Sequence, residues 1–122
     1  MLIKSLGTLH EFVGGDHTEL REFLNPDKDS VALRYSLAHA KLPPQVWSSL
    51  HVLTSSEVYY ILRGAGRMEI NGEQRDVVPG DMIYIPPQSK QRIFSRGPDP
   101  LEFLCIVDPA WRAQDETVLE DK

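Results

Sequence analysis

Short runs of β-forming residues, separated by glycine, proline and asparagine turns, recur through most of this chain and constrain its fold more than any other feature. The strongest run covers residues 57–62, where Val, Tyr, Tyr and Ile follow one another. Asn71 followed by Gly72, between two short apolar runs, is typical of a two-residue hairpin turn. Eight or nine such strands in 122 residues indicate an all-β sandwich or barrel, because a parallel α/β sheet needs helices between its strands.

The predicted strands cover residues 2–13, 31–42, 49–53, 57–62, 67–70, 74–78, 82–85, 91–95 and 101–107. Segment 31–42 alternates with period two, and its bulkier face carries Val31, Leu33, Tyr35, Leu37 and His39. We take this face as a candidate for the barrel interior, which would bring His39 to a pocket. The alternative is a strand histidine that bonds to a neighbouring side chain.

One short helix is predicted near the N-terminus. Two glycines and Asp16 interrupt the opening strand, and Asp16 with Glu19 three positions later has the spacing of a capping box. The apolar residues of segment 17–24 fall at helical spacing, and Pro26 follows it. We therefore expect a helix over residues 17–24, lying against the outside of the fold.

Composition excludes several classes of function. The net charge is −5, and the Lys and Arg residues are scattered singly, which argues against a nucleic-acid partner. No apolar run approaches the roughly 20 residues that span a bilayer, and the N-terminus lacks the apolar stretch of a signal peptide. The lone Cys105 cannot form an internal disulfide, which suits a reducing compartment. We expect a cytoplasmic protein without a membrane partner.

A candidate polar site follows from strand geometry. His51 and Leu53 lie two apart on one strand and share a face, and Glu57 and Tyr59 do so on the next strand. If Glu57 points inward among apolar neighbours, its ionised form needs a cation or a hydrogen-bond donor, or its pKa must rise. Gln91, on a later strand, is the third polar residue of the site.

Two segments resemble the paired motifs of the cupin superfamily, whose members are small double-stranded β-helix or jelly-roll barrels. The first motif has the form G-x5-H-x-H-x3/4-E-x6-G. This chain matches it at His51, Glu57 and Gly64, with Leu53 at the second histidine.

The second cupin motif, G-x5-P-x-G-x2-H-x3-N, is matched at Gly80 and Pro86. Gln88, Gln91 and Ser95 stand where the family has glycine, histidine and asparagine. Because both spacings and the hairpin between the motifs agree, the chain is identified as a member of the superfamily. The resemblance implies an all-β jelly-roll barrel, to which the predicted short helix is added.

The expected organisation is a single cupin domain over residues 1–122. Within it, residues 1–30 hold the opening strand and the short helix, residues 31–109 the barrel, and residues 110–122 a charged tail in which Trp111 packs back on the barrel. The exposed edge strands and the outward Val58 and Tyr60 favour a homodimer.

The resemblance also implies a divalent metal inside the barrel. At the family's ligand positions, His51 and Glu57 are retained, Leu53 cannot ligate and Gln91 offers an amide oxygen. Such a set suits Mn, Fe, Ni or Zn with open positions for a substrate. Tyr59, Leu53 and His39 are the candidate pocket residues. The alternative is a dry cluster in which Glu57, Gln91 and His51 bond to one another without metal.

Three functions stay open. The first is a metal-dependent cupin, as an enzyme acting on a small polar metabolite, with the metal as Lewis acid or O2 activator. The second is a non-catalytic module that binds or senses a small ligand in the same pocket. The third is a metal-free isomerase or epimerase, with His51 as base and Tyr59 or Glu57 as acid. The fold does not decide among them, because one fold hosts many chemistries.

Overall fold

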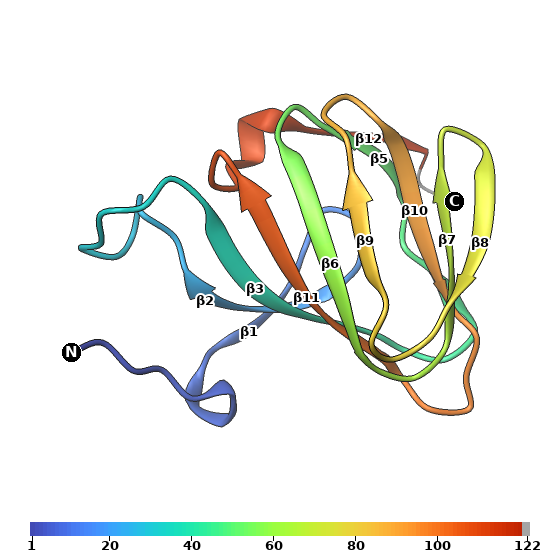
Figure 1. Ribbon diagram of the computed structural model, residues 1–122, viewed down its shortest axis with the longest axis horizontal. Coiled ribbons are helices and arrows are strands. Elements are labelled where there is room, and N and C mark those ends of the chain that lie inside the picture. The colour runs from blue at the N-terminus through green and yellow to red at the C-terminus, as the bar shows by residue number, and fades with distance from the viewer. Residues whose placement is uncertain (121–122) are drawn as a thin grey trace.

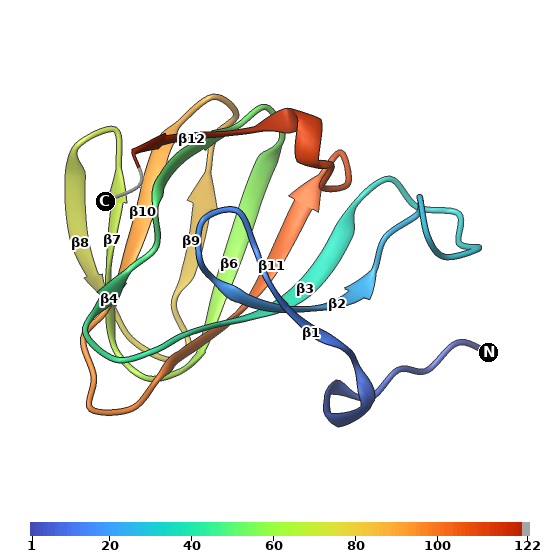
Figure 2. The ribbon, with the colours of Figure 1, turned by 180° about the vertical axis from the view of Figure 1, so that it is seen from behind.

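The computed structural model describes residues 1–120, which form two antiparallel sheets that face each other (Figure 1). The first sheet has the strand order β1-β2-β3-β11-β6-β9, and the second has the order β12-β5-β10-β7-β8, with β4 paired to β10. Strands that are distant in the sequence therefore lie side by side in both sheets. Viewed from behind, β12 crosses the upper part of the barrel and the turn between β1 and β2 lies below it (Figure 2).

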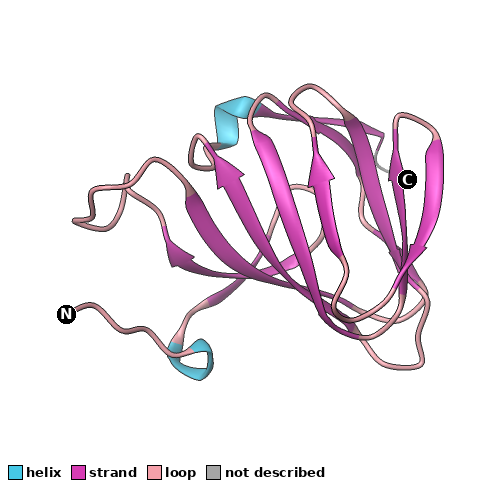
Figure 3. Ribbon diagram, viewed as in Figure 1, coloured by secondary structure: helices cyan, strands magenta, loops and turns pink. Residues whose placement is uncertain are grey.

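Strands and loops make up nearly all of the described chain (Figure 3), which confirms the predicted all-β class. The strands of the first sheet are β1 (Glu11–Val13), β2 (Glu19–Leu24), β3 (Ser36–Leu42), β6 (Ser56–Arg63), β9 (Met82–Ile85) and β11 (Leu101–Asp108). Those of the second are β4 (Val46–Trp47), β5 (Leu50–Leu53), β7 (Gly66–Ile70), β8 (Glu73–Val77), β10 (Lys90–Ser95) and β12 (Glu116–Glu120). Two 3-10 turns, η1 (Leu6–Thr8) and η2 (Ala113–Asp115), complete the described elements, and within residues 1–120 no helix is long and apolar enough to cross a membrane.

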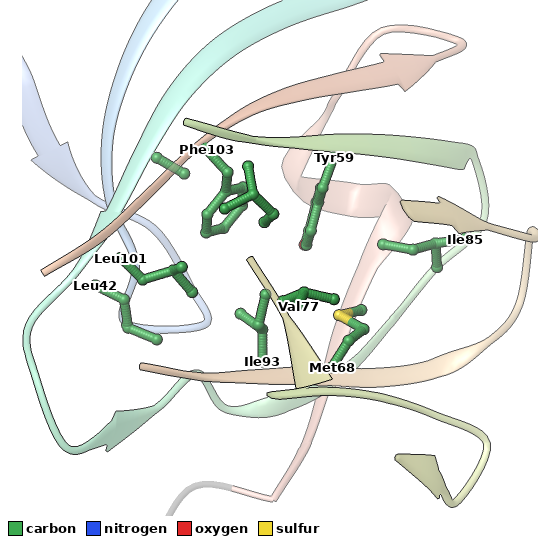
Figure 4. Close-up of a cluster of buried hydrophobic side chains, with 10 residues drawn as sticks. Leu42, Tyr59, Met68, Val77, Ile85, Ile93, Leu101 and Phe103 are labelled. Atoms are coloured by element: carbon green, nitrogen blue, oxygen red, sulfur yellow. The ribbon is translucent and has the colours of Figure 1, made fainter. Parts of the chain in front are cut away.

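The core fills the space between the two sheets with alternate side chains. In β6, Tyr59 and Ile61 are buried, whereas Tyr60 is 45% exposed on the outer face, as the period of two in a strand requires. The Tyr59 ring centroid lies 4.5 Å from that of Phe103 in β11. Figure 4 shows both rings beside aliphatic and Met side chains from the two sheets, namely Leu42, Met68, Val77, Ile85, Ile93 and Leu101.

Segment 17–24 contains a strand, so the prediction of a helix there is wrong. β2 pairs with β1 on one side and with β3 on the other, and Leu20 packs against the core. Two neighbouring strands thus satisfy the backbone of β2, whereas a helix of this length gains little stability by itself. The Asp16 carboxylate accepts a hydrogen bond from the Thr18 N–H at 3.1 Å, and this bond closes a turn between strands instead of capping a helix.

β3 turns its small residues inward. The strand begins at Ser36, and Ser36, Ala38 and Ala40 line an interior cavity. The bulkier face with Leu37 and His39 is therefore on the other side of the sheet, and the proposal that it forms the interior is wrong. Small side chains leave space that bulky ones would fill, so this face makes room for a ligand.

The segment expected to be a charged tail contains one more strand. β12 pairs with β5, with Thr117 opposite Val52. Trp111 packs back on the barrel as predicted, because it lines the cavity and its backbone N–H donates to Ser36 Oγ at 2.9 Å. Residues 121–122 of the predicted tail lie outside the described residues.

The predicted turns are confirmed. β7 and β8 form a hairpin around Asn71 and Gly72, both of which have positive φ angles of 50° and 87°, as a type I′ turn requires. In the turn before β9, Gly80 has a φ of 94° and the Asp81 carboxylate accepts a hydrogen bond from the Val78 N–H at 2.9 Å. Asp81 therefore caps this turn.

Candidate metal and ligand site

A cavity of about 60 Å³ lies between the two sheets. One water needs roughly 10–15 Å³ on this measure, so the cavity has room for a few waters or for a small ligand. Aromatic and aliphatic side chains form much of its wall, together with the small residues of β3. The polar and acidic residues of the wall are Asp16, Thr18, Glu22, Ser36, His51, Glu57, Cys105 and Glu116.

A backbone carbonyl orients the ring of His51. It lies on β5, is 3% exposed, and its Nδ1 is 2.8 Å from the Ser49 carbonyl oxygen. Because a carbonyl oxygen only accepts, Nδ1 carries the proton and donates it. Nε2 faces Asp16 Oδ2 at 3.8 Å and Glu116 Oε2 at 3.9 Å, both too far for a hydrogen bond.

Asp16 and Glu116 reach His51 from opposite ends of the chain. Asp16 lies in the turn between β1 and β2, and Glu116 begins β12, where it pairs with Leu53 of β5. Gly15 permits the close approach of the two segments, since a Cβ atom there would lie 3.1 Å from Glu116 Oε1. The nearby side chain of Trp111 lowers the pKa of Glu116.

The donor set of this cluster fits a divalent metal. Ligand atoms of Asp16, His51 and Glu116 all lie within 4.8 Å of one another. Burial raises the pKa of Glu116, the nearby Asp16 carboxylate raises it further, and His51 opposes both effects. One imidazole nitrogen and two carboxylates suit Mn, Fe, Ni or Zn. A metal-binding histidine is also commonly oriented by a bond from its other ring nitrogen to a backbone carbonyl.

A second polar cluster surrounds Glu57 and is closed by its own hydrogen bonds. Gln91 Nε2 donates to Glu57 Oε1 at 2.6 Å, and the Cys105 thiol donates to Glu57 Oε2 at 3.2 Å. The Tyr59 hydroxyl donates to Gln91 Oε1, also at 3.2 Å. Burial raises the pKa of Glu57, and the nearby His51 and the hydrogen bonds from Cys105 and Gln91 lower it in part. Each carboxylate oxygen of Glu57 therefore already has a partner.

The structure brings most of the predicted site residues together. His51, Leu53, Glu57 and Tyr59 all line the cavity. Gln91 pairs with His51 on the neighbouring strand and bonds to Glu57, although it is not part of the cavity wall. The polar residues predicted for one site are thus divided, with Glu57 and Gln91 in one cluster and His51 facing another.

His39 is not brought to the cavity. Its Nε2 lies 3.1 Å from Glu102 Oε1, and its neighbours Ala38 and Ala40 are the residues of β3 that line the wall. Because successive side chains of a strand point to opposite faces, His39 faces away from the predicted substrate pocket. Its placement matches the alternative of a strand histidine bonded to a neighbour.

The sequence did not indicate that Asp16 and Glu116 belong to the site. The one available signal was Asp16 directly after two glycines, a pattern that favours a tight turn as much as a helix cap. Glu116 stands in a charged segment with no motif of its own. Both residues join the site only through the pairing of β2 and β12 with other strands.

A family comparison assigns the fold. The cupin domain model matches residues 38–107, which is more than half of the chain, so this chain belongs to the cupin family. The jelly-roll prediction is confirmed by the solved cupin structures that superpose on it. Asp16 and Glu116 both lie outside the matched segment.

Two relatives show how far the sequence similarity extends. An uncharacterized protein of Methanocaldococcus jannaschii is 37% identical over 110 residues, which cover 89% of this chain and 87% of that protein. An oxalate-binding protein of Thermotoga maritima is 34% identical over 71 residues, which cover 57% of this chain and 59% of that protein.

Solved structures extend the similarity in fold. A predicted oxalate decarboxylase from Thermotoga maritima has a TM-score of 0.76 and 24% identity, over 89% of this chain and 99% of that one. A nucleoside dehydratase from Streptomyces has a TM-score of 0.79 and 19% identity, over 98% and 92% of the two chains. At these identities the likeness shows a shared fold.

Proposed function

We propose that this cupin binds a divalent metal ion in its barrel cavity and holds a small polar metabolite beside it. One observation carries the proposal: the buried His51 ring donates from Nδ1 to Ser49 and turns its Nε2 toward two carboxylates, with the ligand atoms of all three residues within 4.8 Å of one another. A metal cation at this position would balance the charges of the two carboxylates. The relatives named for oxalate binding and decarboxylation support a small polar ligand.

Asp16, His51 and Glu116 would hold the ion, and Mn, Fe, Ni and Zn are the candidates. Once bound, the ion would supply Lewis-acid polarisation of a ligand or a lowered pKa for bound water. The chain itself orients the donors, because the Ser49 carbonyl accepts a hydrogen bond from His51 Nδ1 and the pairing of Glu116 with Leu53 places the Glu116 side chain. This arrangement serves an enzyme and a non-catalytic binding module equally well.

The ligand set of His51, Glu57 and Gln91 stays a prediction. Both Glu57 oxygens already accept hydrogen bonds, and the Gln91 side-chain carbonyl already accepts one from Tyr59. Ligation by this set would require those bonds to rearrange. We therefore favour Asp16 and Glu116 as the partners of His51.

Metal affinity distinguishes the two sets. Wild-type protein is stripped with a chelator, reloaded with Mn²⁺ or Zn²⁺, and measured by elemental analysis and titration. Asp16→Asn and Glu116→Gln should each weaken metal binding by about tenfold or more. Glu57→Gln is the matched control, since it also removes one carboxylate from the same cavity, and it should bind like wild type.

The reverse result, a loss of metal in Glu57→Gln alone, would support the ligand set predicted from the sequence. Wild type that stays empty after loading would end the metal proposal. It would then favour the metal-free isomerase or epimerase, in which His51 acts as base.

We also propose that the protein is a homodimer formed through the outer face of the first sheet. Tyr60, Met82 and Tyr84 are 45%, 61% and 55% exposed there. Strand register places Tyr60 beside Met82 and Val58 beside Tyr84, so these side chains form a continuous apolar surface across β6 and β9. A second copy of the chain would cover it.

Light scattering tests the dimer. Wild type should have the mass of two chains, and Tyr60→Arg should shift the population toward one chain, because a charge at the centre of an apolar interface is costly to bury. A wild-type monomer at high concentration would contradict the proposal.

We place the protein in the cytoplasm, where the free Cys105 stays reduced.

A further inference from the structure

Small side chains on β3 give the cavity its space, and side chains of the neighbouring strands enclose it. Strand register places Ala40 between Leu20 of β2 and Phe103 of β11, and all three line the cavity. Ala38 lies beside Cys105 of β11 and also lines the cavity. Ala38 is half-buried, and its accessible part faces the cavity because its side chain points inward. We call Leu20, Ala38, Ala40 and Phe103 the apolar floor.

The polar side chains near this floor are engaged with other protein groups. Those of the wall that bond to protein groups outside the proposed metal site are Glu22, Ser36, Glu57, Tyr59 and Cys105. The Thr18 hydroxyl oxygen has almost no accessible surface, so it offers no contact to a ligand. Among the described residues of the wall, the polar contacts left for a ligand therefore lie at the proposed metal, beside Asp16, His51 and Glu116.

The volume of the cavity limits the length of a ligand. A cavity of about 60 Å³ holds roughly four to six water-sized groups. Carboxylate oxygens are common ligands of divalent metals, so a carboxylate suits the polar end of the cavity. Its three non-hydrogen atoms leave room for about one to three carbon atoms over the apolar floor.

We propose that the ligand is a short monocarboxylate whose carboxylate binds the metal and whose alkyl tail lies on the apolar floor, with Ala38 as the residue that sets the tail length. The proposal rests on the metal site proposed above and narrows the metabolite of that site to one that is polar at a single end. Each methylene of the tail that leaves water for the apolar floor favours binding through the hydrophobic effect.

A series of carboxylates tests the tail on the full chain loaded with Co²⁺. The probes are acetate, propionate, butyrate and hexanoate, and the visible spectrum of the bound Co²⁺ and the thermal shift report binding. Affinity should rise about threefold to fourfold per added carbon from acetate to butyrate and fall at hexanoate, whose tail exceeds the space.

A matched pair of probes tests the polarity of the floor. 3-Hydroxypropionate has as many non-hydrogen atoms as butyrate, with a hydroxyl in place of the terminal methyl group. It should bind about tenfold more weakly than butyrate, because its hydroxyl leaves water without gaining a hydrogen-bond partner.

Two substitutions at Ala38 change the space for the tail in opposite directions. Ala38→Val adds two methyl groups and should weaken butyrate about tenfold, while the affinities for acetate and Co²⁺ stay at the wild-type level. Ala38→Gly removes one methyl group and should strengthen hexanoate about twofold to threefold.

Equal affinities along the series overturn the proposal, as does tighter binding of 3-hydroxypropionate than of butyrate. An Ala38→Val variant that binds butyrate like wild type also overturns it, and so does a Co²⁺-loaded chain that binds none of the carboxylates. These failures leave the metal site standing, whereas a chain that takes up no Co²⁺ overturns both proposals.

Discussion

Two polar clusters share one cavity, and they satisfy their buried groups in different ways. Around Glu57, a bond of 2.6 Å from Gln91 and one of 3.2 Å from Cys105 occupy both carboxylate oxygens. Around His51, the carboxylate oxygens of Asp16 and Glu116 stay 3.8 Å and 3.9 Å from the ring nitrogen. A buried polar group needs a partner, so the first cluster is complete as folded, and the second is the one in which we propose a cation.

The two clusters also differ in which part of the chain supplies them. Glu57, Gln91 and Cys105 all lie within residues 38–107, the segment that matches the cupin domain. Asp16 and Glu116 come from the flanking turn and strand, and only His51 of the second cluster belongs to that segment. The complete cluster is thus part of the family barrel, and the open one is built by what surrounds it.

Replacing Glu57 should have the largest effect on stability. Glu57→Ala leaves the donors of Gln91 and Cys105 without an acceptor and opens a hole, so the free energy of unfolding of the metal-free protein should fall by about 3 kcal/mol. Urea unfolding measures this loss. Glu57→Gln, which keeps an acceptor for Gln91, should lose less than half as much. An alanine variant within about 1 kcal/mol of wild type would show that the network contributes little.

Metal should stabilise the open cluster specifically. A metal concentration 100-fold above Kd should raise the free energy of unfolding by about 2.7 kcal/mol. Because Glu116 belongs to β12, hydrogen exchange of β12 amides should slow on metal addition. Glu116→Gln should lose most of this gain, and Glu57→Gln should retain it relative to its own metal-free form. Equal stabilisation of both variants would remove the distinction between the clusters.

The pH dependence of stability should identify Glu57. Burial raises the pKa of Glu57 above its ordinary value of 4.5, so the folded chain keeps a proton that the unfolded chain releases. The resulting stability is fully present below pH 4.5, declines as the pH rises, and is lost above the folded pKa. The stability advantage of metal-free wild type over Glu57→Gln should therefore shrink toward neutral pH.

Groups shared by wild type and Glu57→Gln cancel in that difference. Asp29 and Glu69, whose pKa values are lowered by bonds to Lys4 and Arg92, lose stability in acid in both proteins alike. Chemical unfolding of the two proteins across this pH range gives the result. An advantage that stays constant or grows with pH would contradict a raised pKa for Glu57.

The smallest effect is expected at Cys105. Its thiol donates one weak bond to Glu57 Oε2, so Cys105→Ala should lower the free energy of unfolding by about 1 kcal/mol. Burial raises the pKa of this thiol, and labelling by a thiol reagent should therefore be slow in the folded protein. Fast labelling under native conditions would show that the closed cluster opens readily.

The barrel could be predicted from sequence because its strands carry local signals. β6 and β9 follow from their β-forming residues, and the β7–β8 hairpin from Asn71 and Gly72. The two misread segments, 17–24 and 110–120, lack such a signal, since β2 and β12 exist through pairing with distant strands. In segment 17–24, the hydrogen bonds of β2 to its two neighbouring strands stabilise the strand more than the helical spacing of a few apolar residues stabilises a helix.

The residues of the candidate site also differ in whether a local sequence signal could identify them. His51 and Glu57 could be found because strand alternation and motif spacing act within one short stretch of chain. Asp16 and Glu116 could not, because their nearness to His51 depends on tertiary pairing. The sequence also did not show that both carboxylate oxygens of Glu57 accept hydrogen bonds from Gln91 and Cys105. A metal-free cluster of Glu57, Gln91 and His51 was, however, one of the alternatives.

The order in which the three side chains around His51 occur in the chain has a consequence for biosynthesis. Asp16 and His51 leave the ribosome well before Glu116, and β12 can pair with β5 only after both have emerged. The metal site would therefore be completed late, after most of the barrel has been synthesised. A nascent chain that stops short of residue 116 would contain the family barrel segment but would lack Glu116, the third proposed metal ligand. Only a chain that has been synthesised past residue 116 could then bind the metal with all three ligands.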